Sequence, residues 1–347
     1  MSDQESRGKS SGCRFGCLAL LAAFMVVILL LAGAVIFTLN ASGMKIGCMK
    51  AFCELGSDTA QGEDEFPRLS EIWSSGQGDA TVVRIPLSGV IFFGEPGMIG
   101  DPGSADSAIR AIRRATQDPK IVGIILEVDS GGGGITASDI LYKALLDFKE
   151  AQEGRAVVAL MGDVAASGAY YVSLAADVVM AHPTTLTGSI GVIMQSYNVR
   201  ELARKLGVED VTIKSGANKD LLNPFRELSA EQQAMLQRLV DSLHTRFVRL
   251  VAEARGIEEA DARKLADGRV FLADEAVDLK LIDSVGYMAD AEKALADLLQ
   301  VEQVRVLRYE EERSIFDILR VRRGGFGMQL RNLLNESGTR LLYQWSP

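Results

Sequence analysis

An uncharged run near the N-terminus places the strongest constraint on this chain. No charged residue occurs from Phe15 to Met44, and the centre of that run, residues 17–39, is almost wholly apolar. As a helix rising about 1.5 Å per residue, this centre would span roughly 34 Å, and a bilayer core is about 30 Å thick. We therefore expect a transmembrane signal-anchor over 17–39, and the alternative is a cleaved signal peptide.

Charge on either side of this run predicts its orientation. Three basic residues precede it within 1–16, and an acidic stretch at 54–65 follows it. Because positive charge stays on the cytoplasmic side of a membrane, we expect a cytoplasmic tail over 1–16 and the bulk of the chain on the opposite side. Cys48 and Cys53 would then lie in an oxidising compartment, where a mutual disulfide and two free thiols are both open.

Composition narrows the chemistry of the remainder. The 347 residues include 37 Lys+Arg and 46 Asp+Glu, and the net charge of −9 argues against a nucleic-acid binder. His182 and His244 are the only histidines, and the four cysteines form no paired C-x-x-C motif. Neither a multi-histidine zinc site nor a disulfide framework is therefore expected, and we expect no other cofactor. A triad hydrolase would have to take one of the two histidines as its base.

Strand and helix patterns alternate beyond residues 40–78, which have the mixed composition of a stalk. β-rich apolar runs occur at 81–93, 120–129 and 155–161, and each is followed by a helical pattern. This alternation predicts an α/β fold with a parallel sheet built from right-handed βαβ units.

The later part of the chain is expected to hold one long helix and a tail. Residues 229–255 fit a helix, with Ser229 and Gln232 as a capping box at its start. We assign the folded domain to 79–300 and a C-terminal tail to 301–347. That tail would contact another copy of the chain, lie on the membrane or be disordered.

Three positions with potential chemistry follow the predicted strands, where ligands and catalytic groups gather in α/β sheets. The glycine run 131–134 would cradle a phosphate, hold an oxyanion or form a flexible turn. Ser167 opens an apolar helix and is either an N-cap or a nucleophile beside the helix N–H groups. The third is a pair of loops that hold Ser189 and Lys219. Taken alone, Lys219 is typical of a solvated loop lysine.

The ordered set of loop motifs resembles the membrane-anchored signal peptide peptidases of the SppA type. These are serine proteases with a crotonase/ClpP-like fold and a Ser–Lys dyad, and the resemblance covers about residues 80–290. The spacing is also family-like, with 22 residues from Ser167 to Ser189 and 52 from Ser167 to Lys219. The motifs that carry the resemblance are GVIFFG (89–94), the glycine run (131–134), AASGAYY (165–171), AAD (175–177), TGSIGVI (187–193), KSGANKD (214–220) and DGRVF (267–271).

This resemblance implies a fold, a site and a set of partners. The fold would consist of repeated crotonase/ClpP-like β-β-α units around a parallel sheet. The site would use Ser167 as nucleophile, Lys219 as general base and Ser189 to orient the lysine amine. The oxyanion hole would be formed by Gly132, Gly133 and Gly168.

The implied substrates are hydrophobic remnant signal peptides or unfolded polypeptides. The protein would be a single-pass protein of the bacterial inner membrane, with its catalytic domain on the periplasmic side. It would form a homo-oligomer, a ring or dome of four or eight chains, in which neighbouring chains complete one site. The alternatives are a broader membrane-associated quality-control protease and a non-catalytic scaffold of the same fold.

Two details of the implied site raise structural questions. Asp129-Ser130-Gly131 stands where the family usually has Asn-Ser-Pro, so the loop loses a proline, and the Asp129 charge would oppose an oxyanion if it pointed inward. A lysine base must be neutral, whereas a free lysine has a pKa of about 10.4. Burial away from opposite charges favours the neutral amine, so we expect Lys219 to be buried and Asp220 to point away from it.

Overall fold

The computed structural model describes residues 69–94, 104–311 and 341–344. The expected tail 1–16, the expected anchor 17–39, Cys48 and Cys53 all lie outside these residues. Among the helices that are described, none is long and apolar enough to cross a bilayer.

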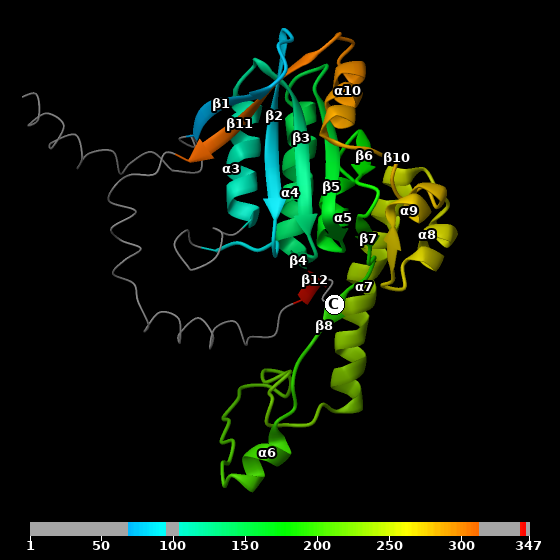
Figure 1. Cartoon of the computed structure of the whole chain (residues 1–347). Helices are drawn as coiled ribbons and strands as arrows, with labels where there is room; N and C mark the ends of the chain where they lie inside the picture. The colour runs from blue at the N-terminus through cyan, green and yellow to red at the C-terminus, as the bar shows by residue number, and fades with distance from the viewer. Residues whose placement is uncertain (1–68, 95–103, 312–340, 345–347) are drawn as a thin grey trace, which may run out of the picture. The chain divides into compact units, whose positions relative to one another are not determined.

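A mixed sheet forms the centre of the described part (Figure 1), and its strands run in the order β1-β11-β2-β3-β5-β6-β10, with β7 joined to β5 and β9 joined to β7. The parallel pairing of β2, β3, β5 and β6 confirms the expected α/β sheet. The strands are β1 (Leu69–Ser75), β2 (Ala80–Ser88), β3 (Ile121–Ser130), β5 (Ala156–Ala166), β6 (Val178–Ala181), β7 (Leu186–Gly188), β9 (Val270–Leu272), β10 (Ser284–Val285) and β11 (Val304–Glu311).

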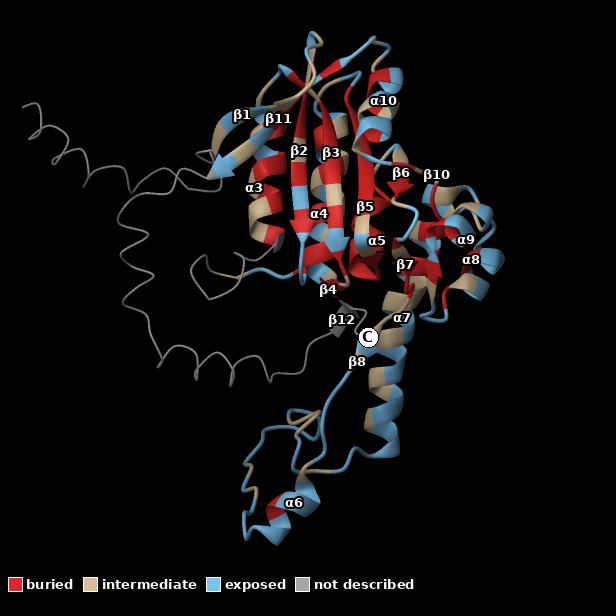
Figure 2. Ribbon diagram, viewed as in Figure 1, coloured by how far each residue is buried: buried red, intermediate tan, exposed pale blue. Residues whose placement is uncertain are grey.

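Helices cover both faces of this sheet. Because successive strand residues point to opposite faces, Ile124 of β3 packs in one apolar cluster with α3, α4 and α5, whereas Ile125 packs in a second cluster with α10. Figure 2 shows the resulting buried residues along the central strands. The helices are α3 (Ser104–Gln117), α4 (Ile135–Glu150), α5 (Gly168–Ser173), α6 (Arg200–Lys205), α7 (Ala230–Arg255), α8 (Glu259–Leu265), α9 (Ala273–Asp278) and α10 (Met288–Leu298).

The sheet reaches beyond the limits that we expected for the folded domain. β1 lies inside the expected stalk 40–78 and pairs antiparallel with β11, which lies inside the expected tail 301–347. β11 in turn pairs parallel with β2. Two segments that are far apart in the chain therefore close one edge of the sheet together.

A second, small sheet lies beyond the carboxyl end of β3. It has the order β4-β12-β8, and all of its pairs are antiparallel. Its strands are β4 (Gly132–Gly134), β8 (Ile193–Met194) and β12 (Leu341–Gln344).

Residues 195–229, called the arm here, lead from β8 to α7 and contain α6. Ala203 is the only buried residue that the structure describes in the arm, and apolar side chains such as Val211 and Ile213 are 83% and 98% exposed. The arm ends at the expected capping box, in which Gln232 N–H donates to Ser229 Oγ over 3.1 Å. The buried residues of α7 lie only in its C-terminal half, so this helix joins the arm to the core (Figure 1).

A buried arginine at the start of β5 holds the ends of two helices. The Arg155 guanidinium donates to the carbonyl oxygens of Ala115, Thr116, Phe148 and Asp118, at 2.9 to 3.4 Å. It also lies 4.5 Å from the centre of the Phe148 ring. Because the carbonyls at a helix C-terminus lack partners within the helix, this cation satisfies the final turns of α3 and α4.

Replacing Arg155 with methionine is expected to lower the free energy of unfolding by about 2–4 kcal/mol, because several buried carbonyls lose a charged donor. Urea denaturation followed by circular dichroism measures the change. Arg204→Met, which breaks only an exposed pair with Glu201, serves as the control and is expected to cost less than about 1 kcal/mol. Equal losses in both variants would contradict this role of Arg155.

Candidate active site

Ser167 occupies the turn between β5 and α5 in a conformation that is uncommon for a non-glycine residue. Its φ is 56° and its ψ is −116°, and only 1% of the residue is exposed. Its N–H donates to the Gly188 carbonyl over 2.7 Å, and its own carbonyl accepts from Tyr171 N–H over 2.9 Å. The side chain forms no capping hydrogen bond to α5. A strained backbone held from both sides, with an uncommitted hydroxyl, is typical of a functional serine rather than a helix cap.

Ser189 lies beside Ser167 at the end of the neighbouring strand. β5 and β7 are parallel, with Ala166 opposite Gly188, so the two serines follow the last paired residues of adjacent strands. Ser189 also has a positive φ, 49°, and its N–H donates to the Arg269 carbonyl over 2.8 Å. The structure therefore brings these two candidate residues together.

The glycine run that follows β3 is fixed by backbone pairing with Ile91. Ile91 N–H donates to the Gly132 carbonyl over 2.9 Å, and Gly134 N–H donates to the Ile91 carbonyl over 2.7 Å. Gly132 N–H donates to Ser130 Oγ over 3.0 Å, so this expected oxyanion donor already has an acceptor. The Gly132 carbonyl and the Gly134 N–H thus both face Ile91. The N–H of Gly133, between them, points the other way. Gly132 is thus engaged within its own loop, and the Gly133 N–H lies on the edge of β4 where β12 pairs opposite it.

The carboxylate of Asp129 is turned toward β5. Its Oδ1 accepts from Val164 N–H over 3.1 Å, and its backbone carbonyl accepts from Gly89 N–H over 3.0 Å. The carboxylate that replaces the family's asparagine is therefore bound by the β5 backbone. Its negative charge, which would oppose an oxyanion if it pointed inward, faces the Val164 N–H instead.

Lys219 lies on an exposed turn of the arm and not in a buried site. Within the described residues its amine has no hydrogen-bond or ion-pair partner, so a single chain does not provide the burial expected for a lysine base. Asp220 is paired elsewhere, with Lys214 Nζ at 2.6 Å and Arg226 Nη1 at 3.1 Å. The hydrogen bond from Lys214 holds the pKa of the Asp220 carboxyl below its usual range.

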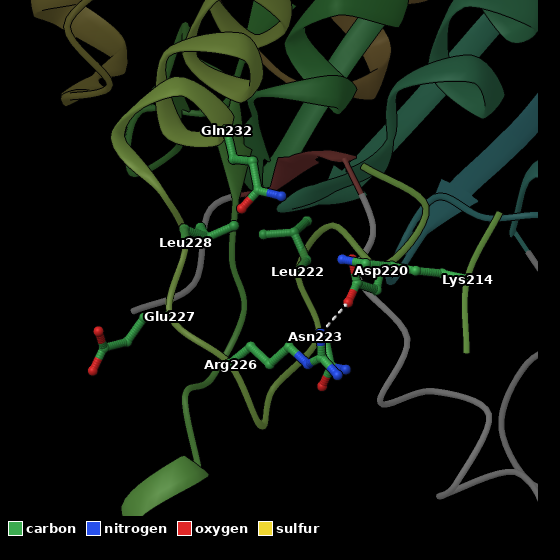
Figure 3. A pocket seen from close by; sticks show the side chains of 8 residues that line it. All are labelled: Lys214, Asp220, Leu222, Asn223, Arg226, Glu227, Leu228 and Gln232. Carbon is green, nitrogen blue, oxygen red and sulfur yellow. Dashed lines mark hydrogen bonds and ion pairs between the residues drawn. The ribbon is translucent and has the colours of Figure 1, made fainter. Parts of the chain in front are cut away.

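These charged groups border a small polar cavity in the arm (Figure 3). Its volume is about 180 Å³, and Asp220, the residue after Lys219, lies in its wall. The residues that line it are Lys214, Asp220, Leu222, Asn223, Arg226, Glu227, Leu228 and Gln232. The arm is therefore folded around ion pairs and not around an apolar core.

β12 lies between the glycine run and β8 as an added strand. Tyr343 is opposite Gly133, and Leu342 is opposite both Gly134 and Ile193. β12 also contacts α5, the helix that Ser167 precedes. An extended segment that pairs with two strand edges is a common way for proteins to bind a peptide. The facing edges of β4 and β8, called the groove here, thus hold an extended chain against α5, the helix that Ser167 precedes.

Neither histidine belongs to this site. His182 Nδ1 lies 3.0 Å from the Gly286 carbonyl, and His244 Nε2 lies 2.8 Å from the Ala266 carbonyl. Both rings therefore join loops of the fold to their neighbours, and neither provides the base of a Ser–His pair.

Gly133→Ala is expected to disrupt the site, because a Cβ at this position would lie 2.1 Å from the Ile91 carbonyl oxygen. We expect labelling of Ser167 by a serine-reactive phosphonate to fall at least about tenfold, since small displacements of catalytic groups are costly. Gly134→Ala is the matched control, because its Cβ would lie 3.6 Å from the same oxygen, an ordinary contact. Similar labelling of both variants would show that close backbone approach does not set the loop.

Comparison with known proteins places the chain in a family. Residues 149–302 match the model of Peptidase family S49. The chain is 33% identical over 248 residues to a putative signal peptide peptidase SppA of Enterococcus faecium, covering 71% of this chain and 72% of that protein. It is 34% identical over 241 residues to Protease 4 of Salmonella typhi, covering 69% of this chain and 38% of that protein.

Among solved structures, a mutant ClpP1 from Listeria monocytogenes aligns with a TM-score of 0.39 and 16% identity, over 61% of this chain and 94% of that one. The range matched by the family model, 149–302, includes Ser167, Ser189 and Lys219. The chain belongs to peptidase family S49 and is a serine peptidase of the signal peptide peptidase type.

Proposed function

We propose that this protein is a membrane-bound endopeptidase that uses a Ser167–Lys219 dyad to degrade remnant signal peptides. The observation that carries the proposal is the position of Ser167, buried and strained beside Ser189 and at the end of a groove that holds an extended strand. The expected anchor at 17–39 would keep this groove at the surface of the bacterial inner membrane, on its periplasmic side.

The reaction would be acyl transfer through the serine hydroxyl. Ser167 Oγ attacks the peptide carbonyl carbon while its proton passes to the neutral amine of Lys219. The N–H groups of Gly133 and Gly168 donate to the oxyanion that forms. The protonated lysine then gives its proton to the departing amine, and water hydrolyses the acyl-enzyme by the same path in reverse.

Ser189 would accept a hydrogen bond from the lysine amine and orient it toward Ser167. Its position at the adjacent strand end supports this role, because any amine that reaches Ser167 Oγ arrives next to it. The Ser189 N–H is hydrogen-bonded to the Arg269 carbonyl, which fixes the backbone from which the hydroxyl extends.

We propose that the lysine reaches Ser167 from a neighbouring copy of the chain in a homo-oligomer. Lys219 is exposed on an arm whose apolar side chains, such as Val211 and Ile213, are almost fully exposed as well. Exposed apolar surface of this kind marks a contact with a partner. Burial between two copies would also remove the amine from water, which favours its neutral form.

Ser167→Ala and Lys219→Ala are each expected to lower the rate of cleavage of a synthetic signal peptide by at least about 10³-fold, because each removes a group that acts in the chemical step. Co-expression of the two variants tests the origin of the lysine. If each site combines two chains, mixed oligomers recover up to about a quarter of the wild-type rate, since half of the serines and half of the lysines are intact.

The outcomes separate the parts of this proposal. Full activity of either variant alone would exclude the dyad. Inactive mixed oligomers, shown by mass spectrometry to contain both chains, would place both residues in one chain. An assembled, folded wild-type protein that neither cleaves peptides nor labels with a phosphonate would favour the non-catalytic scaffold.

Removal of residues 341–347 is expected to increase kcat/KM for a synthetic signal peptide by about threefold or more, because β12 occupies the groove that a substrate strand would enter. The control is a chain that ends at residue 344 and keeps β12. Equal activity of the two shortened proteins would mean that β12 does not compete with substrate.

A further inference from the structure

A single hydrogen-bond cluster joins three helices of the core. The Tyr171 hydroxyl donates to Asp139 Oδ1 over 2.6 Å, and Arg246 Nη2 donates to the same oxygen over 2.7 Å. Asp139 lies in α4, Tyr171 in α5 and Arg246 in α7. One carboxylate oxygen therefore connects segments that are far apart in the sequence.

Each of these helices is attached to a different part of the proposed active site. α4 begins at Ile135, immediately after the glycine run. α5 begins immediately after Ser167, and Tyr171 N–H donates to the Ser167 carbonyl over 2.9 Å. α7 carries the arm, and near its start Gln232 Nε2 donates to Asn218, the residue before Lys219, over 3.3 Å.

The Tyr171 ring is fixed by packing as well as by its hydroxyl. The residue is 1% exposed, and its ring centre lies 5.6 Å from that of Tyr142 and 5.1 Å from that of Phe247. These rings belong to α4 and α7, the same two helices that the hydroxyl reaches. Burial and the neighbouring Asp139 carboxylate raise the pKa of the Tyr171 phenol, so the hydroxyl remains a donor at neutral and mildly alkaline pH.

We infer that Tyr171 is a positioning residue for catalysis, which through Asp139 aligns the oxyanion loop with the nucleophile and orients the arm that presents Lys219 to the neighbouring copy. It touches no substrate and transfers no proton. The inference rests on the proposed dyad, because it concerns the alignment of Ser167 with its oxyanion donors and the direction in which the arm presents Lys219 to the neighbouring copy.

The chain provides a matched control one residue away. Tyr170 is also fully buried in α5, and its hydroxyl donates to the Leu281 carbonyl over 2.8 Å, in the loop after α9. Tyr170→Phe and Tyr171→Phe therefore each remove one buried tyrosine hydrogen bond from the same helix. Only Tyr171→Phe removes the hydrogen bond that joins α5 to Asp139 of α4 and, through Asp139, to Arg246 of α7.

The test uses the full-length protein in detergent with a synthetic signal peptide as substrate. Tyr171→Phe is expected to lower kcat about tenfold with KM changed less than about twofold, because misaligned groups slow the chemical step without weakening strand pairing. Phosphonate labelling of Ser167 should slow by a similar factor. Tyr170→Phe should keep both rates within about twofold of wild type. Its melting temperature should fall by about as much as that of Tyr171→Phe, because each variant loses one buried hydrogen bond.

Equal effects of the two variants on kcat, or no effect of Tyr171→Phe, would overturn the inference. Asp139→Asn is a second variant for the same test, since it keeps the side-chain volume and weakens the hydrogen bonds to both Tyr171 and Arg246. If Tyr171→Phe fails to fold, the kcat of Asp139→Asn decides between the same outcomes. Failure of the proposed function would look different, because wild-type protein would then itself neither cleave the peptide nor label at Ser167.

Discussion

The change of partner along β5 is the constraint on which the site depends. The strand pairs with β6 from Val158 to Met161 and then with β7 from Val164 to Ala166, while β3 follows its other edge. Because β7 replaces β6 only at the end of the strand, the chain after β7 turns back directly beside Ser167. That exchange places Ser189 next to Ser167, the proposed nucleophile, and the hydrogen bond from Ser167 N–H to the Gly188 carbonyl holds the strained turn in place.

Local patterns in the sequence predicted the parts of the site that depend on single strands and turns. The apolar runs, the glycines after β3, Ser167 after β5 and the capping box at Ser229 lie where the sequence predicted them. Pairing between distant segments has no such local signal. The closure of the sheet by β1 and β11, the bonds of the glycine run to Ile91, and the addition of β12 therefore appear only in the structure.

The arm shows why the position of Lys219 was the least predictable part of the site. A lysine base suggested burial, yet many apolar side chains of this segment are exposed and form no core that could bury an amine. Its turns are held by pairs among Asp210, Asp220, Lys214 and Arg226. Exposed ion pairs contribute little stability each. The arm is therefore ordered mainly through its attachment to α7, and a contact with another copy would provide the missing burial.

Backbone recognition in the groove connects the substrate class with the chain's own β12. A strand held between β4 and β8 is recognised through main-chain pairing, and the three glycines of β4 add no side chain to their edge. Main-chain pairing alone discriminates weakly among side chains, which suits the substrates that we propose, remnant peptides of varied sequence. The same tolerance lets a segment of this chain enter, and its covalent attachment gives it a high effective concentration. If substrate enters where we propose, free peptides compete with β12 for the edges of β4 and β8.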